Sequence, residues 1–208
     1  MHLKLIYFDF PFWRAEVSRL ALHLGGVPFE DVRPNREAFR ALKASGSLPY
    51  GQLPVLDVDG VRIAQAVTII RFCGQLAGLY PREDLLAAAR VDELLDACTD
   101  ITLLLGPSMR AQDATERAEL RRRLAEEIFP RWLGFLEKRL ATNAPSPYFV
   151  GDQLSVADLA IWRILGWLTG GILDGIPTDL LEPHAALQAH YERIDAHPGV
   201  REWMSRYA

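Results

Sequence analysis

The sequence predicts a small α/β domain followed by an all-helical domain, and three observations support this fold class. Up to about residue 80, short strand-like runs alternate with helical stretches. Beyond that point, apolar residues recur at spacings of three and four, which is the period of an amphipathic helix. Between these two regions lies "AGLYPRED", residues 77–84, whose glycine and proline are typical of a linker. We therefore expect domains at residues 1–79 and 85–208.

The first domain is expected to contain a small mixed sheet with helices packed on its faces. Strand-like runs occur at residues 3–8, 27–33, 53–58 and 61–64, and helical stretches occur at residues 14–24, 36–44 and 65–76. Gly25 and Gly26 stop the first helix, and Asp59-Gly60 forms a tight hairpin turn. This order predicts strand, helix, strand, helix, a two-strand hairpin and a final helix, which fits an α/β layer architecture.

The second domain is expected to be helical throughout. Helices are predicted at residues 85–110, 115–140 and 156–169, with shorter helices to the end of the chain. In "LSVADLA", the Ser155 hydroxyl can accept from the Asp158 amide while the Asp158 carboxylate accepts from the Ser155 amide. We expect this reciprocal cap to make Asp158→Ala cost about 1 to 2 kcal/mol of stability.

Composition and charge exclude several classes of function. The 208 residues carry a net charge of -4, and a nucleic-acid surface needs clustered Lys and Arg instead. The basic run at residues 121–123 is followed by Glu126 and Glu127, so we interpret it as a solvated helix face. No apolar stretch reaches the roughly 20 residues of a membrane span, and no charged leader precedes one, so we expect a cytoplasmic protein. Cys73 and Cys98 lack metal-site spacing, and we expect two reduced thiols and no metal.

The stretch "YFDFPFWRAE" places Tyr7 at the end of the first strand, beside a turn crowded with aromatic residues. Two interpretations are open at this point. The tyrosine can be part of the hydrophobic core, or its phenol can be the hydroxyl donor of a site walled by aromatic rings.

The chain resembles the cytosolic glutathione S-transferases, and it is most similar to their tyrosine-type, sigma-like branch. The resemblance runs nearly end to end, through "YFDFPFWRAE", "LPYGQLPVLDVDG", "AQAVTIIRF" and "GDQLSVADLA". It implies a thioredoxin-like N-terminal domain, an all-α C-terminal domain and a homodimer. It also implies glutathione as co-substrate, whose thiolate attacks a small apolar electrophile.

By this resemblance, Tyr7 is the catalytic phenol that stabilises the thiolate of glutathione. Other branches carry a serine or cysteine near the first helix, whereas this chain has Phe10 there, before Pro11 and Phe12. One departure is that the sigma pattern has five residues between its tyrosine and arginine, and six separate Tyr7 from Arg14 here.

The resemblance also implies which residues bind the two substrates. The expected glutathione-binding residues are Phe39, Lys43, Gln52, Leu53, Pro54, Gln65, Ala66 and Asp100. The Leu53-Pro54 bond is expected to be cis, and Leu53 to pair with the glutathione backbone. The helix beginning near Gln65 is expected to hold the γ-glutamyl carboxylate, Lys43 the glycyl carboxylate, and Asp100 the glutamyl ammonium across a dimer interface. Ala66 stands where the family has serine.

For the electrophile, the expected pocket lies between the domains and is lined by Phe8, Trp13, Arg14, Met109 and Trp162. The aromatic residues of this set, Phe8, Trp13 and Trp162, also fit a second interpretation, in which they form interdomain core. Three functions stay open on the sequence: glutathione conjugation, a binding protein of this fold without useful turnover, and a glutathione-dependent isomerase or peroxidase. Ala66 and the additional residue after Tyr7 favour the binding protein.

Overall fold

The computed structural model describes residues 1–207, which divide into two compact units. Unit 1 comprises Met1–Ala88 together with the C-terminal segment from Pro198, and unit 2 comprises Ala89–His197. The C-terminal segment belongs to unit 1 because helix α9 (Pro198–Met204) packs against helix α1 (Trp13–Leu24) and buries Val200 and Trp203. The units therefore divide after Ala88 and again before Pro198, whereas the linker suggested a single boundary at residues 79–85.

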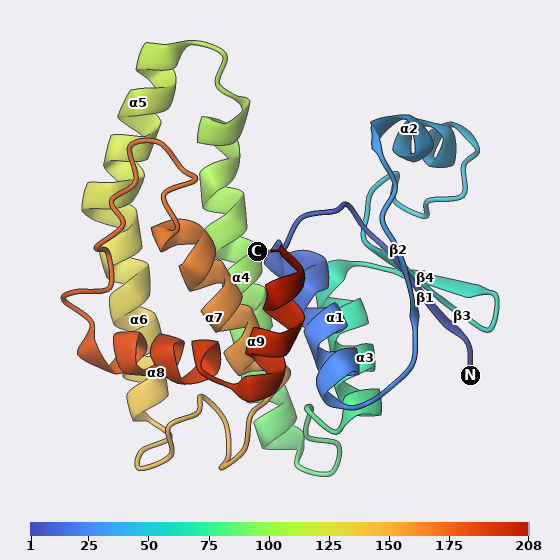
Figure 1. Ribbon diagram of the computed structural model, residues 1–208. Coiled ribbons are helices and arrows are strands. Elements are labelled where there is room, and N and C mark those ends of the chain that lie inside the picture. Colours follow the sequence, from blue (N-terminus) through green and yellow to red (C-terminus); the bar gives the residue numbers. More distant parts are fainter. Residues whose placement is uncertain (208) are drawn as a thin grey trace. The chain divides into compact units, whose positions relative to one another are not determined.

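Unit 1 is built on a four-stranded mixed sheet with the order β2-β1-β3-β4 (Figure 1). Its strands are β1 (Leu3–Ile6), β2 (Glu30–Val32), β3 (Val55–Val58) and β4 (Val61–Ala64). Strands β1 and β2 are parallel, with Leu5 opposite Asp31, whereas β3 is antiparallel to both β1 and β4. The parallel crossover through α1 and the hairpin at Asp59-Gly60 therefore match the order predicted from the sequence.

Helices α1 and α3 (Ala66–Ala77) pack side by side in unit 1 (Figure 1). They converge so closely at their C-terminal ends that a Cβ atom on Gly25 would lie 2.6 Å from the Cα of Ala77. Only glycine fits this approach. Helix α2 (Arg36–Ala44) has no buried residue, and its N-terminus is capped by the Asn35 side chain, which accepts from the Ala38 amide at 2.9 Å.

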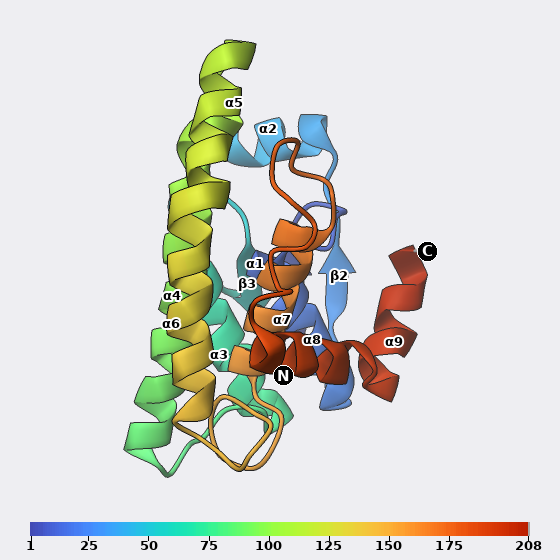
Figure 2. The same ribbon diagram turned by 90° about the vertical axis from the view of Figure 1, so that its left-hand side faces the viewer.

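Unit 2 contains only helices and loops among its described residues. Its helices are α4 (Leu85–Arg110), whose first turn belongs to unit 1, α5 (Ala114–Arg123), α6 (Phe129–Ala141), α7 (Val156–Thr169) and α8 (Ala185–Asp195). The single helix predicted at residues 115–140 is interrupted by a π-helical turn, Leu124–Ile128, although α5 and α6 continue one another as one rod (Figure 2). Pro130 explains the turn, because it has no N–H to donate to the carbonyl four residues earlier.

The N-terminus of α7 is fixed by the carboxylate of Asp158, which is fully buried. Both reciprocal contacts of the predicted capping box are present, and the Ser155 amide donates to Asp158 Oδ2 at 2.9 Å. The Ser155 hydroxyl also donates to Oδ2 at 2.8 Å. Beyond the box, Asp158 Oδ1 accepts from the Phe149 amide at 2.9 Å and lies 3.0 Å from His190 Nε2. One carboxylate thus joins α7 to the preceding loop and to α8.

Within residues 1–207, no helix combines the length and apolar character needed to cross a membrane.

Candidate functional site

Tyr7 directly follows β1, and its backbone continues the sheet because its amide donates to the Val32 carbonyl at 3.0 Å. The side chain is only 4% exposed. Burial raises the pKa of the phenol to about 12, against the opposing effect of the positive charges of Arg14 and Arg19. The phenol therefore stays protonated at neutral pH. Its hydroxyl makes no hydrogen bond within the described chain, so the donor remains available to a bound group.

The aromatic turn after Tyr7 forms a contiguous set of rings. The ring centroid of Tyr7 lies 5.5 Å from that of Phe8 and 5.6 Å from that of Phe10. Phe39, from α2, joins the set through an edge contact with Phe8 at 5.1 Å. The six residues between Tyr7 and Arg14 bend at Asp9 and Phe10. Of the two arginines that lower the pKa of Tyr7, Arg14 has the larger effect.

The N-terminus of α3 presents unpaired backbone donors. The first bond of the helix runs from the Ile69 amide to the Gln65 carbonyl at 3.0 Å, and no side chain caps this end. The amides of Ala66, Val67 and Thr68 therefore lack an intrahelical partner and can hold an anion. Gln65 is exposed and has φ +75°, a conformation that costs free energy for a residue other than glycine.

The segment before β3 offers further backbone groups. The Leu53-Pro54 peptide bond is cis, as the resemblance implied. Neither the amide nor the carbonyl of Leu53 is hydrogen-bonded within residues 1–207, so both can pair with an extended ligand. Lys43 and Gln52 are exposed close by, since the Cε of Lys43 would lie 3.6 Å from a Cβ on Gly51. Unit 1 thus gathers Tyr7, the α3 terminus and this segment as parts of one domain.

The remaining predicted residues vary in exposure. Trp13 in unit 1 and Trp162 in unit 2 are 1% and 3% exposed, so both indoles are buried. Met109 is 55% exposed on α4. Asp100 lines a pocket of about 400 Å³ in unit 2, together with Trp132 and Phe135.

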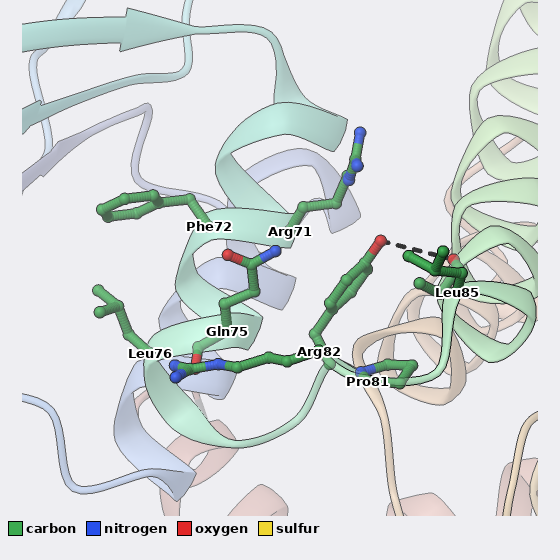
Figure 3. Close-up of a pocket in the computed structure, with 9 residues that line it drawn as sticks. Arg71, Phe72, Gln75, Leu76, Pro81, Arg82 and Leu85 are labelled. Atoms are coloured by element: carbon green, nitrogen blue, oxygen red, sulfur yellow. Dashed lines mark hydrogen bonds between the residues drawn. The ribbon is translucent and has the colours of Figure 1, made fainter.

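A pocket of about 500 Å³ in unit 1 lies between α3 and the start of α4 (Figure 3). Arg71 and Gln75 reach it from α3, and Arg82 donates from the linker to the Gln75 carbonyl. The Tyr80 hydroxyl donates to the Ala88 carbonyl at 3.5 Å. Neither Tyr7 nor the α3 N-terminus lines this pocket, so it is separate from the groups described above.

The two cysteines are buried thiols without a disulfide. Burial raises the pKa of Cys73 to about 12 and also raises the pKa of Cys98. Both thiols therefore stay protonated and cannot supply a nucleophile at neutral pH.

The sequence reasoning missed a polar cluster that contacts the backbone of Tyr7 through Arg19 and is formed by Glu16, Arg19, Trp203 and the half-buried Tyr207. Glu16 and Arg19 are both 0% exposed. The available signal was their i,i+3 spacing inside the otherwise apolar helix "AEVSRLAL", a pattern that indicates an internal ion pair. Nothing local connects this helix to a tryptophan and a tyrosine that lie 187 and 191 positions after Glu16.

Comparison with known proteins gives consistent similarities over both units. Residues 3–75 match the family model "Glutathione S-transferase, N-terminal domain", and residues 99–206 match "Glutathione S-transferase, C-terminal domain". "Glutathione S-transferase 1" of Ascaris suum is 35% identical over 209 residues, covering 97% of this chain and 95% of that protein.

Two solved structures are similar over the whole chain. The prostaglandin synthase D of Nilaparvata lugens has a TM-score of 0.86 at 26% identity, covering 100% of this chain and 99% of that one. The monomeric Na-GST-3, a glutathione S-transferase of Necator americanus, has a TM-score of 0.86 at 27% identity, covering 100% and 98%.

Proposed function

This chain belongs to the glutathione S-transferase family and is a glutathione transferase, and we propose that Tyr7 activates glutathione by donating a hydrogen bond to its thiolate. A free thiol has a pKa of about 8.5, so most glutathione is unreactive at neutral pH. A donor aimed at the sulfur favours the anion and lowers that pKa. The observation that carries the proposal is the protonated, unpartnered phenol of Tyr7 at the end of β1.

Arg14 supplies the second electrostatic contribution. Its positive charge acts on the Tyr7 phenol and lowers the pKa of that group, although burial has the larger, opposite effect. The same charge favours a thiolate held against the phenol, because opposite charges attract strongly in a poorly solvated site.

In the proposed complex, the rest of glutathione extends over unit 1. The γ-glutamyl carboxylate accepts from the free amides of α3, beginning at Ala66, with Gln65 beside it. The cysteinyl backbone pairs with Leu53, which precedes Pro54, and the glycyl carboxylate faces Lys43. Gln52 and Phe39 border this path. The free backbone groups of Leu53 and the uncapped end of α3 support this placement.

Ala66→Ser is expected to tighten glutathione binding about ten-fold, measured by calorimetry. The serine adds a hydroxyl donor to the γ-glutamyl carboxylate, and a hydrogen bond to a charged group contributes about 1.5 to 3 kcal/mol. The pKa of the bound thiol should stay close to that of the parent, since the change is remote from the sulfur. Ala64→Ser in β4 is the matched control and should bind like the parent. Equal affinities for all three proteins would refute the proposal that the α3 amides hold the γ-glutamyl carboxylate without a side-chain hydroxyl at position 66.

The second substrate is proposed to be a small apolar electrophile that contacts Phe8 and Arg14 of unit 1. A glutathione-dependent isomerase is the second candidate, favoured by the similarity to the prostaglandin synthase D of Nilaparvata lugens. Isomerisation uses the same thiolate on a different substrate, so Tyr7 keeps its role in both. The cytoplasm is the proposed location, where thiols such as Cys73 and Cys98 stay reduced.

One experiment separates these functions. Calorimetry with glutathione is combined with turnover assays on a generic aryl halide, an organic hydroperoxide and an isomerisable enone. Conjugation of the aryl halide supports the transferase proposal, and turnover of only the enone or the hydroperoxide supports the isomerase or peroxidase. Binding without any turnover points to the non-catalytic binding protein, and absence of binding contradicts the placement of glutathione.

We also propose a homodimer in which Asp100 reaches the glutamyl ammonium of glutathione bound to the second copy. The pocket beside Asp100 is also lined by Glu93, Asp96 and Arg139. Arg139 is ion-paired with Glu93, so Asp100 and Asp96 are the carboxylates proposed to face the ammonium. One relative in this family is described as monomeric, so assembly needs its own test. Light scattering coupled to size-exclusion chromatography should give the mass of two chains; the mass of one chain would overturn this part.

A further inference from the structure

The guanidinium of Arg19 restrains the backbone at Tyr7 and Phe8. The Nη2 of Arg19 donates to the carbonyl of Tyr7 at 3.4 Å and to that of Phe8 at 3.3 Å. Its Nε donates to Asp31 Oδ1 of β2 at 3.0 Å. Tyr7 and Phe8 lie beyond the last residue of β1, where the sheet alone no longer holds the chain on both sides. Arg19 therefore takes over the restraint of the backbone at this point.

Glu16 holds that guanidinium in turn. Its Oε2 accepts from Arg19 Nη1 at 3.1 Å, and both side chains are fully buried. A buried carboxylate needs further donors, since one ion pair does not repay its desolvation. Those donors come from the C-terminal segment of unit 1: Trp203 Nε1 donates to Oε1 at 2.5 Å, and the Tyr207 hydroxyl donates to Oε2 at 3.0 Å.

We propose that the C-terminal segment is a positioning element for catalysis, which sets the place of the Tyr7 phenol through Glu16 and Arg19. Trp203 and Tyr207 hold Glu16, Glu16 orients Arg19, and Arg19 holds the carbonyls of Tyr7 and Phe8. The inference rests on the proposed role of Tyr7, and it adds the residues 203 and 207 as positioning residues that touch no substrate. The C-terminal segment should therefore affect the pKa of the thiol of bound glutathione.

The physical basis is the sharp distance dependence of a hydrogen bond. A donor that moves by a few tenths of an ångström from its acceptor loses much of the bond, whereas packing elsewhere hardly changes. The Tyr207 hydroxyl is suited to hold Glu16, because burial and the Glu16 charge raise the pKa of Tyr207 to about 12 and keep it protonated. A merely structural role for the same contacts would lower stability and leave the site chemistry unchanged.

Two variants remove one donor each and retain an aromatic ring. Tyr207→Phe removes the hydroxyl bound to Glu16 Oε2, and Trp203→Phe removes the indole N–H bound to Oε1. Tyr148→Phe is the matched control, since Tyr148 lies in the loop before α7 and its hydroxyl has no hydrogen bond to a described residue. Each substitution is also made in the Tyr7→Phe background, so that an effect through Tyr7 can be distinguished from any other effect.

The primary readout is the pKa of enzyme-bound glutathione, followed by the ultraviolet absorbance of the thiolate. We expect Tyr207→Phe and Trp203→Phe to raise this pKa by about 0.5 and to lower kcat/KM about three-fold or more at pH 6.5, with little change in the affinity for glutathione. Tyr148→Phe should match the parent. In the Tyr7→Phe background, the same two substitutions should have no further effect on the bound thiol.

A second readout needs no ligand and separates this proposal from the proposed function. The protein is labelled with 3-fluorotyrosine, and the fluorine resonance of Tyr7 is assigned by its loss in Tyr7→Phe. Trp203→Phe and Tyr207→Phe should shift or broaden that resonance, whereas Tyr148→Phe should not. An unmoved Tyr7 resonance in both variants overturns the proposal, even if their free energy of unfolding falls. If the parent does not bind glutathione, the proposed function fails, and the fluorine spectra still decide the positioning role.

Discussion

Tyr7→Phe is expected to lower turnover about 100-fold or more, the largest catalytic effect in this protein. The substitution removes the phenolic donor and keeps the ring contacts with Phe8 and Phe10. The thiolate then loses its hydrogen bond, so less of the bound glutathione is ionised at neutral pH. Steady-state kinetics on an aryl halide measure the loss.

Two controls define this result. The affinity of Tyr7→Phe for glutathione should remain near that of the parent, because the tripeptide is held by backbone groups elsewhere in unit 1. Tyr148→Phe, which removes a phenol far from β1 in sequence, should retain full activity. Turnover of Tyr7→Phe within a factor of two of the parent would remove Tyr7 from the mechanism.

Asp158→Ala is expected to reduce the free energy of unfolding by about 3 to 5 kcal/mol, the largest stability effect. The structure raises this value above the 1 to 2 kcal/mol expected from a cap alone. The carboxylate also holds the Phe149 amide and His190 Nε2 in a fully buried place. Its removal leaves those donors without a partner, in addition to the lost contacts with Ser155.

Denaturant unfolding followed by circular dichroism measures this loss. Asp152→Ala is the matched control, because Asp152 is exposed in the loop just before α7. That variant should unfold at the midpoint of the parent. A midpoint for Asp158→Ala equal to that of Asp152→Ala would show that the buried carboxylate adds no stability.

The features that sequence predicted well are those encoded within a few residues. The strand before Tyr7, the hairpin at Asp59-Gly60 and the helix start at Ser155 each depend on local backbone preferences, and the structure has elements at all three places. The cis Leu53-Pro54 bond came from the resemblance and needed a proline.

The features that sequence did not predict depend on contacts between distant residues. The bond from Trp203 to Glu16 spans 187 positions, and the bond from Tyr207 to Glu16 spans 191. The hydrophobic periodicity of a helix does not indicate which of its faces a distant terminal segment will cover. The π-helical turn before Pro130 was missed for a different reason, since one helix was predicted across residues 115–140 without taking Pro130 as a possible interruption.

If the Tyr7 phenol stabilises the thiolate of bound glutathione, the pKa of the bound thiol must depend on the Tyr7 hydroxyl. The absorbance of the thiolate is followed against pH for glutathione bound to the parent and to Tyr7→Phe, at saturating protein. We expect the pKa of the thiol to lie below the free value of about 8.5 in the parent and to rise by at least about 1 in the variant. Equal pKa values for the thiol bound to the two proteins would contradict this role of the phenol.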